Sequence, residues 1–282
     1  MTSQTFLNDI VAAAKKLRPR IALPEGGDDR VLSAAARAHS DGIAECILFG
    51  DAAQISARAK KLNIALPDSL VVMPPPLEEF VAPLAKLRAH KGMDESRAAE
   101  MLRANSAAAA AMMVREKRAD GMLAGAAAAS ADVLRPILQI LGAAKNARIV
   151  SSFFAMAMPG GAAIFADCAM NVRPSSEELA EIARQSANSA RRFGIDPAVA
   201  MLSYATGESA DGEEVSRVRK AAEIARAQMP DVPVCGPIQY DAAVSPQIAA
   251  VKIPQWKAAG RANVLIFPDL AAGNIAYKAV QQ

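Results

Sequence analysis

Four stretches of the sequence carry groups suited to binding phosphate or an oxyanion. The shortest is residues 88–92, RAHKG, where Arg88, His90 and Lys91 precede a glycine. Arginine binds two phosphate oxygens in a fixed fork, and lysine adds a point charge. Cations also suit the solvated C-terminus of a helix, where they favour the dipole. Spacing alone leaves a phosphate ligand and a helix end equally open.

A loop of small residues forms the second stretch, residues 119–136, ADGMLAGAAAASADVLRP. It is typical of a strand, a loop and a helix that carries Arg135. The Ser130 hydroxyl and the N–H groups of the loop are suited to holding an oxyanion, with Arg135 reaching it from the helix. Close packing of the helix on the sheet explains the small residues equally well.

The third stretch is residues 23–30, LPEGGDDR, with a glycine pair between a strand and a helix start. Backbone N–H groups in such a loop can cradle phosphate. The spacing is not that of the dinucleotide fingerprint GxGxxG. Because acidic residues at a helix N-terminus act as caps, a structural role is favoured for Asp28 and Asp29.

The fourth stretch, residues 201–215, places polar side chains after a strand, at the edge where open α/β sheets bind ligands. These are Ser203, Tyr204, Thr206 and Gly207. The acidic residues that follow are Glu208, Asp211, Glu213 and Glu214. No histidine is near and their spacing is not that of an EF-hand, so we expect a solvated loop and a helix cap and no metal site.

The cysteines and histidines offer little further chemistry. Cys46, Cys168 and Cys235 are far apart and odd in number, which argues against a disulfide framework or a structural zinc and suits a reducing cytoplasm. Cys168 lies in an apolar setting without a neighbouring histidine, so we expect a buried, inert thiol. His39 and His90 form no evident Ser/His/Asp set.

Strands and helices alternate along the chain, which predicts an α/β fold with mainly parallel sheets and helices on both faces. The expected strands are residues 20–23, 44–49, 70–73, 121–124, 149–156, 162–166, 199–204, 234–238 and 264–267. The expected helices are an amphipathic N-terminal one, one that starts at residues 50–51, and residues 30–40, 77–89, 94–117, 132–141, 175–191 and 212–228. Pro83 is a possible break, and Pro74, Pro75 and Pro76 close the third strand.

The rhythm resets near residues 142–148, which indicates two α/β/α domains, residues 1–145 and 146–282, with a cleft between them. Residues 149–166 read as a hairpin around Pro159, hence an antiparallel portion. Ser175 and Glu178 form a capping box. At the chain's end, a strand over 264–267 is followed by a helix over 275–280 that Gly273 and Asn274 open, a corner typical of phosphate or nucleotide sites.

Composition narrows the classes of function. The chain has 282 residues, 52% hydrophobic, and enough length for two cores. Aromatic residues make up only 4% and the net charge is +3, so nucleic acid and an acidic membrane are poor partners. No signal peptide and no stretch long enough for a membrane span is evident, and a cytoplasmic protein is expected.

Taken together and in order, several motifs resemble the phosphate acetyltransferase (phosphotransacetylase) family over nearly the whole chain. Phosphate butyryltransferases and the acyltransferase-like domain of some malic enzymes are more distant members of the same superfamily. The motifs are IALPEGGDDRVLSAAARA, LRAHKGM, ADGMLAGAAAASADVLRPILQI, VSSFF, FADCAMN, VAMLSYATG, YDAAVSP and ANVLIFPDLAAGNIAYKAVQ.

The resemblance implies a homodimer that transfers an acetyl group between coenzyme A and phosphate in a ternary complex, with coenzyme A as substrate, no cofactor and no metal. The deprotonated thiol would attack the carbonyl of acetyl phosphate. The second domain would carry the dimer contact. Arg88 and Arg135 match arginines that the family uses for phosphate or coenzyme A, and Ser130 matches a hydroxyl near the phosphate. Asn274, Tyr277 and Lys278 lie in its closing motif.

The chain also departs from the family pattern. Ala128 and Ala129 stand where a histidine and a Ser or Thr are common, and Gln282 stands where an arginine is usual. The family continues for a few dozen residues with a DLSRG motif and an aspartate. Three explanations are open: an unseen tail, a truncated product, or a descendant that binds acyl-CoA or acetyl phosphate without turnover. A butyryltransferase-like enzyme and, more weakly, a nucleotide-dependent dehydrogenase remain alternatives.

Overall fold

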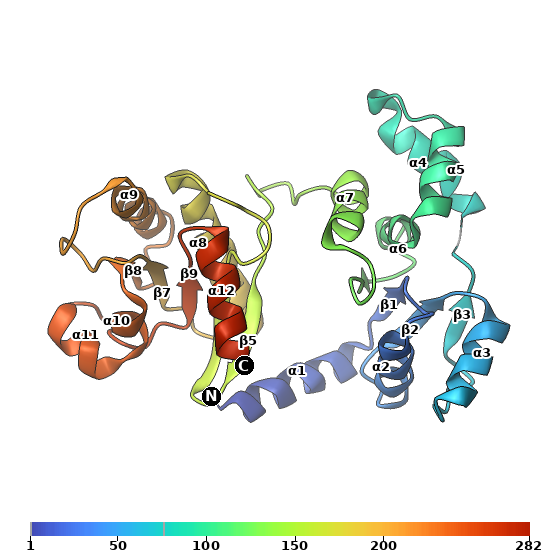
Figure 1. Cartoon of the computed structure of the whole chain (residues 1–282), viewed down its shortest axis with the longest axis horizontal. Coiled ribbons are helices and arrows are strands. Elements are labelled where there is room, and N and C mark those ends of the chain that lie inside the picture. Colours follow the sequence, from blue (N-terminus) through green and yellow to red (C-terminus); the bar gives the residue numbers. More distant parts are fainter. Residues whose placement is uncertain (1, 76) are drawn as a thin grey trace. The chain divides into compact units, whose positions relative to one another are not determined.

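The computed structural model describes residues 2–75 and 77–282 (Figure 1). The chain forms two compact units: residues 10–142, and residues 143–282 together with residues 2–9. Each unit has its own sheet, and the prediction of an α/β fold with mainly parallel sheets is confirmed. The predicted strand end at Pro76 lies outside the described residues. The predicted cleft between domains stays a prediction.

The sheet of the first unit is parallel throughout, with the strand order β3-β2-β1-β4. Parallel neighbours need crossover connections, which helices α2 and α3 supply between the first three strands. The loops that follow β1 and β4 therefore emerge at the same, carboxyl edge. The elements are β1 Arg20–Leu23, α2 Asp29–Ser40, β2 Glu45–Phe49, α3 Ala52–Lys61, β3 Val71–Met73 and β4 Gly121–Met122.

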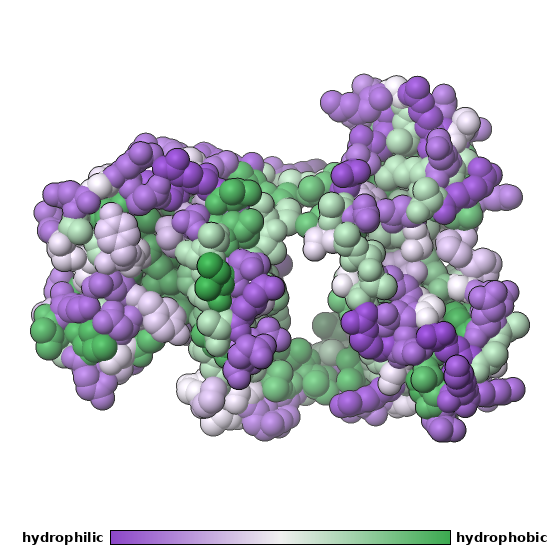
Figure 2. Space-filling view, viewed as in Figure 1, coloured by the Kyte–Doolittle hydropathy of each residue, from purple (hydrophilic) through white to green (hydrophobic). Residues whose placement is uncertain are grey.

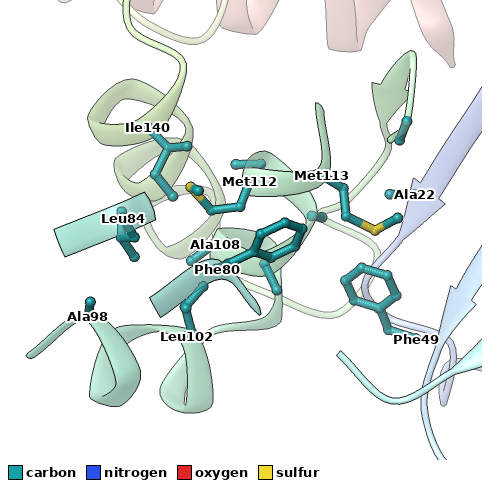
Figure 3. Close-up of a cluster of buried hydrophobic side chains, with 14 of the residues drawn as sticks. Ala22, Phe49, Phe80, Leu84, Ala98, Leu102, Ala108, Met112, Met113 and Ile140 are labelled. Atoms are coloured by element: carbon teal, nitrogen blue, oxygen red, sulfur yellow. The ribbon is translucent and has the colours of Figure 1, made fainter. Parts of the chain in front are cut away.

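Four further helices of this unit meet in one buried cluster, shown in Figure 3. Each contributes a side chain that is almost fully buried: Leu84, Leu102, Met112 and Ile140. This cluster fixes the helices that carry Arg88 and Arg135. The helices are α4 Glu78–Arg88, α5 Glu95–Ala104, α6 Ser106–Arg115 and α7 Ser130–Ile140, and a 3-10 turn, Ala89–Lys91, follows α4.

The single helix predicted over residues 94–117 is wrong, because the chain breaks at Asn105. Asn105 has extended backbone angles (φ −143°, ψ 104°), and its side-chain oxygen accepts from the N–H of Ala107 at 2.9 Å. Its amide group donates to the carbonyl of Asp132 at 2.7 Å. Asn105 thus caps a new helix and ties it to α7, a competition that asparagine's short polar side chain makes possible. The suspected break at Pro83 does not occur, since α4 continues through it.

The second unit has a five-stranded sheet in the order β5-β6-β9-β7-β8. Its β5/β6 pair is antiparallel, so the predicted hairpin is confirmed, and the remaining pairs are parallel. The strands are β5 Phe154–Met158, β6 Gly161–Ala166, β7 Val199–Leu202, β8 Val234–Ile238 and β9 Val264–Ile266.

The first strand of that hairpin begins later than predicted. Residues 149–153 lie outside it, and the carbonyls of two of them bind side chains instead. Gln185 donates to the Ile149 carbonyl and Asn171 to the Val150 carbonyl, both at 3.0 Å. Because these carbonyls serve helix and loop side chains, the strand pairs only from Phe154 onward.

Helices cover both faces of this sheet, and the capping box at Ser175 is confirmed. The closing helix α12 starts at Leu270, not at residue 275, because Asp269 caps it by accepting from the N–H of Ala272 at 2.8 Å. Gly273 and Asn274 therefore lie inside the helix. Two short helices, α10 and α11, were not predicted. The helices are α8 Ser176–Arg192, α9 Glu213–Gln228, α10 Tyr240–Val244, α11 Pro246–Lys252 and α12 Leu270–Gln281.

The N-terminal helix α1, Ser3–Leu17, begins within the second unit. Phe6 is 2% exposed and packs edge-on against Phe193, with ring centroids 6.0 Å apart. Burial of this one aromatic side chain explains why residues 2–9 belong with residues 143–282. The other residues of α1 are at least partly exposed, as expected of an amphipathic surface helix.

Hydrophilic side chains cover much of the visible face of each unit, with apolar areas between them (Figure 2). Large exposed apolar side chains are scattered over several elements and include Leu17, Val172, Val251 and Ile275. Of the helices formed by the described residues, none combines the length and apolar character that crossing a bilayer requires.

We expect Leu84→Ala to lower the free energy of unfolding by about 2–5 kcal/mol, because it leaves a cavity in the cluster that anchors α4 and α7. Urea unfolding followed by circular dichroism measures this. Leu17→Ala, at a side chain that is 78% exposed, is the matched control and should change stability by less than about 0.5 kcal/mol. Equal effects of the two variants would contradict the assigned core.

Candidate functional site

The loops that follow the parallel strands hold most of the residues singled out from the sequence. In the first unit these loops follow β1 and β4. In the second unit they follow β6, β7 and β9. Ligands of open α/β sheets bind at this carboxyl edge, so each unit presents one candidate surface.

The Glu25 carboxylate organises the carboxyl edge of the first unit. Its Oε2 accepts from the N–H groups of Gly125 and Ala126 at 2.8 and 2.9 Å. Its Oε1 accepts from those of Ala127 and Ala128 at 2.9 and 2.7 Å. Four consecutive backbone donors of the loop after β4 thus converge on one side chain from the loop after β1. A carboxylate has about four acceptor sites, so the match is complete.

The pKa of Glu25 reflects this arrangement. Partial burial by itself raises the pKa. The four N–H groups together lower it by more than burial raises it, so the pKa of Glu25 lies below the usual value of a glutamate. The side chain is therefore ionised at neutral pH. The prediction that the loop's N–H groups hold a substrate oxyanion is corrected here, because four of them bind the protein's own carboxylate.

A second contact joins the same two loops. Arg30 donates to the Ala126 carbonyl and forms a two-pronged ion pair with Asp28, at 3.0 and 2.8 Å. Asp28 is the N-cap of α2, as predicted, and the hydrogen bonds from Arg30 lower its pKa to about 2. Gly26 is required for packing, because a Cβ there would lie 2.4 Å from the Phe49 carbonyl oxygen. The glycine pair thus shapes the turn that presents Glu25.

Arg88 lies at the end of α4, and its Nη1 donates to the Gln139 carbonyl at 2.9 Å. Arg115 donates to the neighbouring Ile140 carbonyl at 2.8 Å. The two guanidinium groups satisfy carbonyls at the C-terminus of α7, where cations favour the dipole. Arg88 Nε is buried and has no partner among the described residues. Of the RAHKG side chains, His90 and Lys91 are exposed.

Helix α7 carries the other two residues predicted for this unit. Ser130 is its first residue, and Ala129, at the N-cap, supplies no side-chain cap. Ser130 and Arg135 are both exposed, and among the described residues Arg135 forms no ion pair. Five residues apart, they lie about 140° apart around the helix axis, so the helix alone does not put them on one face. Arg88 reaches the same helix about one turn beyond Arg135.

In the second unit a buried aspartate plays the part that Glu25 plays in the first. Asp167, 2% exposed, follows β6 and accepts from the N–H groups of Ala169, Met170 and Asn171 at 2.9, 3.0 and 3.2 Å. The Ser152 hydroxyl and the Asn171 amide group also donate to it. Asp167 was not predicted as a functional residue, although it lies in FADCAMN, one of the motifs that resemble the phosphate acetyltransferase family.

Of the residues predicted in the closing motif, only Asn274 lies at this edge. Its amide group donates to the Cys168 carbonyl at 3.2 Å. It also lines a cavity of about 520 Å³ with Arg173 and Asp269. Tyr277 lies a turn further along α12 and stacks on Phe154 with ring centroids 4.0 Å apart. Lys278 is exposed, with its Nζ 5.6 Å from the centre of the Tyr277 ring.

The loop after β7 is held by neighbouring elements. Thr206 accepts from the Gln239 N–H at 3.1 Å, which joins this loop to the one after β8. Arg173 forms ion pairs with Glu213 and Glu214 at 2.8 and 2.6 Å. Both carboxylates lie in the first turn of α9, but no side chain of the described residues caps that helix, so the predicted helix cap is wrong and they pair with an arginine instead. No group of three or more potential metal ligands occurs within residues 2–75 and 77–282.

The Cys168 thiol is fully buried, as predicted. Burial, together with the negative charge of Asp167, raises its pKa to about 12. A thiol that stays protonated is a poor nucleophile, so its position in this turn is structural. Gly273 of α12 packs against the same turn, since a Cβ there would lie 2.5 Å from the Asp167 carbonyl oxygen.

A family model described as "Phosphate acetyl/butaryl transferase" matches residues 5–282. Two curated relatives are the phosphate acetyltransferases of Haemophilus influenzae, 43% identical over 278 residues, and Escherichia coli, 42% identical over 284 residues. The matches cover 98% and 100% of this chain but 38% and 40% of those proteins. The chain thus spans about two fifths of the length of these relatives.

The chain is also similar to solved structures of phosphotransacetylases. The EutD phosphotransacetylase from Staphylococcus aureus superposes with a TM-score of 0.89, and a phosphotransacetylase from Streptococcus pyogenes with 0.90. Each is 36% identical, and the matches cover all of this chain and 87% and 86% of those chains. A branched-chain phosphotransacylase from Enterococcus faecalis, 20% identical with a TM-score of 0.64, shares the fold.

We expect Asp167→Asn to lower the free energy of unfolding by about 1–3 kcal/mol, because an amide nitrogen cannot accept the N–H groups that Asp167 binds. Thermal and urea unfolding measure the loss. Asp196→Asn, at an exposed carboxylate, serves as the control and should be neutral. If both variants unfold at the same urea concentration, the Asp167 carboxylate does not hold its turn.

Proposed function

The chain belongs to the phosphate acetyl/butaryl transferase family, as its motifs indicated, and on this basis we propose that it transfers an acetyl group between coenzyme A and phosphate. The observation that carries the proposal is similarity along the whole chain to proteins named phosphate acetyltransferase. Their greater length makes the activity of this chain a question for experiment.

The reaction transfers the acetyl group of acetyl-CoA to phosphate, which gives coenzyme A and acetyl phosphate. In the reverse direction the thiol loses its proton, the thiolate attacks the acetyl carbonyl, and phosphate leaves with the electrons of the C–O bond. Both substrates carry phosphate, so cations must face them, and the tetrahedral intermediate carries an oxyanion that needs donors. Holding both substrates in one complex supplies further acceleration.

Arg135 and Ser130 are the groups we assign to phosphate. Arg135 is exposed and unpaired among the described residues, so its guanidinium is available to an anion. Ser130 adds a hydroxyl at the N-terminus of α7, where the helix dipole favours negative charge. Arg88 supports the same helix from its C-terminal end and offers a buried Nε as a further donor.

Three residues of the second unit are also assigned to substrate in this proposal. Asn274 is assigned to substrate binding, because its side chain lines the cavity at the start of α12. Tyr277 and Lys278 lie further along the helix, where Lys278 can meet a phosphate of coenzyme A from the surface. We assign coenzyme A as a substrate, with neither a cofactor nor a metal in the chemical step.

The proposed localisation, oligomeric state and partners are those that the resemblance to the family implies. It is a cytoplasmic homodimer that associates through residues 146–282 and binds neither nucleic acid nor membrane. A butyryl substrate is the alternative acyl group, since the family model covers both. A module that binds acyl-CoA or acetyl phosphate without turnover is a second candidate, favoured by Ala128 and Ala129 and by the loop donors that Glu25 already occupies.

The variant Arg135→Ala tests whether Arg135 binds phosphate in the proposed reaction. We expect kcat/KM for phosphate-dependent release of coenzyme A to fall about 10²–10³-fold, the usual effect of removing a donor to developing charge. Arg103→Ala, at an exposed arginine on α5, is the control and should retain full activity. Kinetics of Arg135→Ala equal to those of the control would overturn the assignment. Calorimetric binding of coenzyme A by an inactive wild-type protein would favour the binding module.

A further inference from the structure

We propose that Glu25 is a positioning residue, a built-in anion that sets the loop of residues 125–128 and thereby the start of α7 that receives phosphate. The inference rests on the proposed function for what α7 binds. It adds that the residues assigned to phosphate depend for their position on Glu25, which does not itself bind phosphate.

The loop of residues 125–128 cannot fix its own conformation. It consists of Gly125 and three alanines, so it has no side chain that forms a hydrogen bond. Gly125 has a φ of +101°, a region that favours glycine and leaves many conformations accessible. The order of this loop must therefore come from a neighbouring element.

The neighbouring loop supplies that order through two side chains. Glu25 binds the four successive N–H groups, and Arg30 binds the Ala126 carbonyl. The backbone of Glu25 is itself held, because its carbonyl accepts from the Asp28 N–H at 2.9 Å. Asp28 in turn caps α2, which packs on the sheet. The constraint thus runs from a packed helix through Glu25 to the small-residue loop.

The loop leads directly into α7. Ala129 is the N-cap, and Ser130 begins the helix two residues after the last N–H that Glu25 binds. A change in the loop therefore moves the Ser130 hydroxyl and the first N–H groups of α7. The C-terminal end of the helix is held by Arg88 and Arg115, and Asn105 binds the Asp132 carbonyl in its first turn, so loss of Glu25 should disturb residues 125–130 most.

Ionisation matters as much as shape. The lowered pKa keeps Glu25 charged at neutral pH, and each of its oxygens accepts two N–H groups. Glutamine has nearly the same size but only one accepting oxygen, and its NH2 group would face two donors. The charge also competes with any other anion for these four N–H groups. Phosphate is thereby left to the Ser130 hydroxyl and the first N–H groups of α7.

Glu25→Gln tests the proposal in the 282-residue protein, with Glu100→Gln as the control at an exposed glutamate on α5. Hydrogen exchange of the amides of residues 125–128 should become about 10-fold faster or more in Glu25→Gln, and stay unchanged in the control. The KM for phosphate should rise about 10-fold, while the KM for acetyl-CoA stays within about twofold.

Chemical rescue makes the test specific. In Glu25→Ala, added formate can occupy the four N–H groups, so it should slow their exchange again and lower the KM for phosphate. A loss of general folding would not respond to formate. Wild-type exchange rates at residues 125–128 in Glu25→Gln, or an unchanged KM for phosphate, would overturn the inference.

The two proposals fail in different ways. If the wild-type protein releases no coenzyme A, the enzyme assignment fails, and calorimetric binding of inorganic phosphate replaces the KM. Faster exchange with weaker phosphate binding in Glu25→Gln would then support the positioning role, and unchanged binding would refute it. If the wild-type protein is active and Glu25→Gln is equally active, the enzyme assignment stands and the positioning role fails.

Discussion

The carboxyl edge of each sheet has a carboxylate that binds several backbone N–H groups, in a neighbouring loop for Glu25 and in its own loop for Asp167. Glu25 holds residues 125–128, and Asp167 holds residues 169–171. Gly125 and the three alanines after it have no side chain that could fix their loop, and without Glu25 their N–H groups would have only water or another anion to bind. Charge-assisted hydrogen bonds are roughly twice as strong as neutral ones, so one acidic side chain can order several residues.

This constraint decides which groups remain for a substrate. A row of loop N–H groups looks like a phosphate cradle in the sequence, yet Glu25 occupies it, and the proposed function therefore assigns phosphate to side chains on α7. Helix α7 is then fixed from both ends: the loop held by Glu25 leads into its first turn, and Arg88 and Arg115 bind its last carbonyls. The exposed Arg135 lies between these anchors and needs no partner of its own to stay in place.

Local patterns in the sequence predicted much of the fold. Strands β1 and β8 occur over the predicted residues, and the capping box at Ser175 starts α8, because the information for each lies within a few positions. The predicted element boundaries are wrong where a side chain binds a backbone group that is distant in sequence. Asn105 interrupts a helix by binding Asp132, and the carbonyls of residues 149–150 serve distant side chains. Glu25 acts across about 100 residues, so no local window contains its partners. An acidic residue directly after a buried strand, with a loop of small residues after another strand of that sheet, is the signal that points to such a bond.

The two alanines that depart from the family pattern take on a defined meaning in this geometry. Glu25 binds the backbone N–H of Ala128, and Ala129 caps α7 through its backbone alone. Neither contact involves the side chain, so alanine keeps both of them, although at the N-cap it lacks the hydroxyl acceptor that a serine or threonine would offer to the first turn of α7. A histidine at position 128 would add a ring nitrogen, and a serine or threonine at the N-cap would add a hydroxyl that can accept from a first-turn N–H. The substitutions therefore remove side-chain chemistry and leave the loop that positions Ser130 intact, which separates the question of whether this chain turns over its substrate from the question of whether it can bind one.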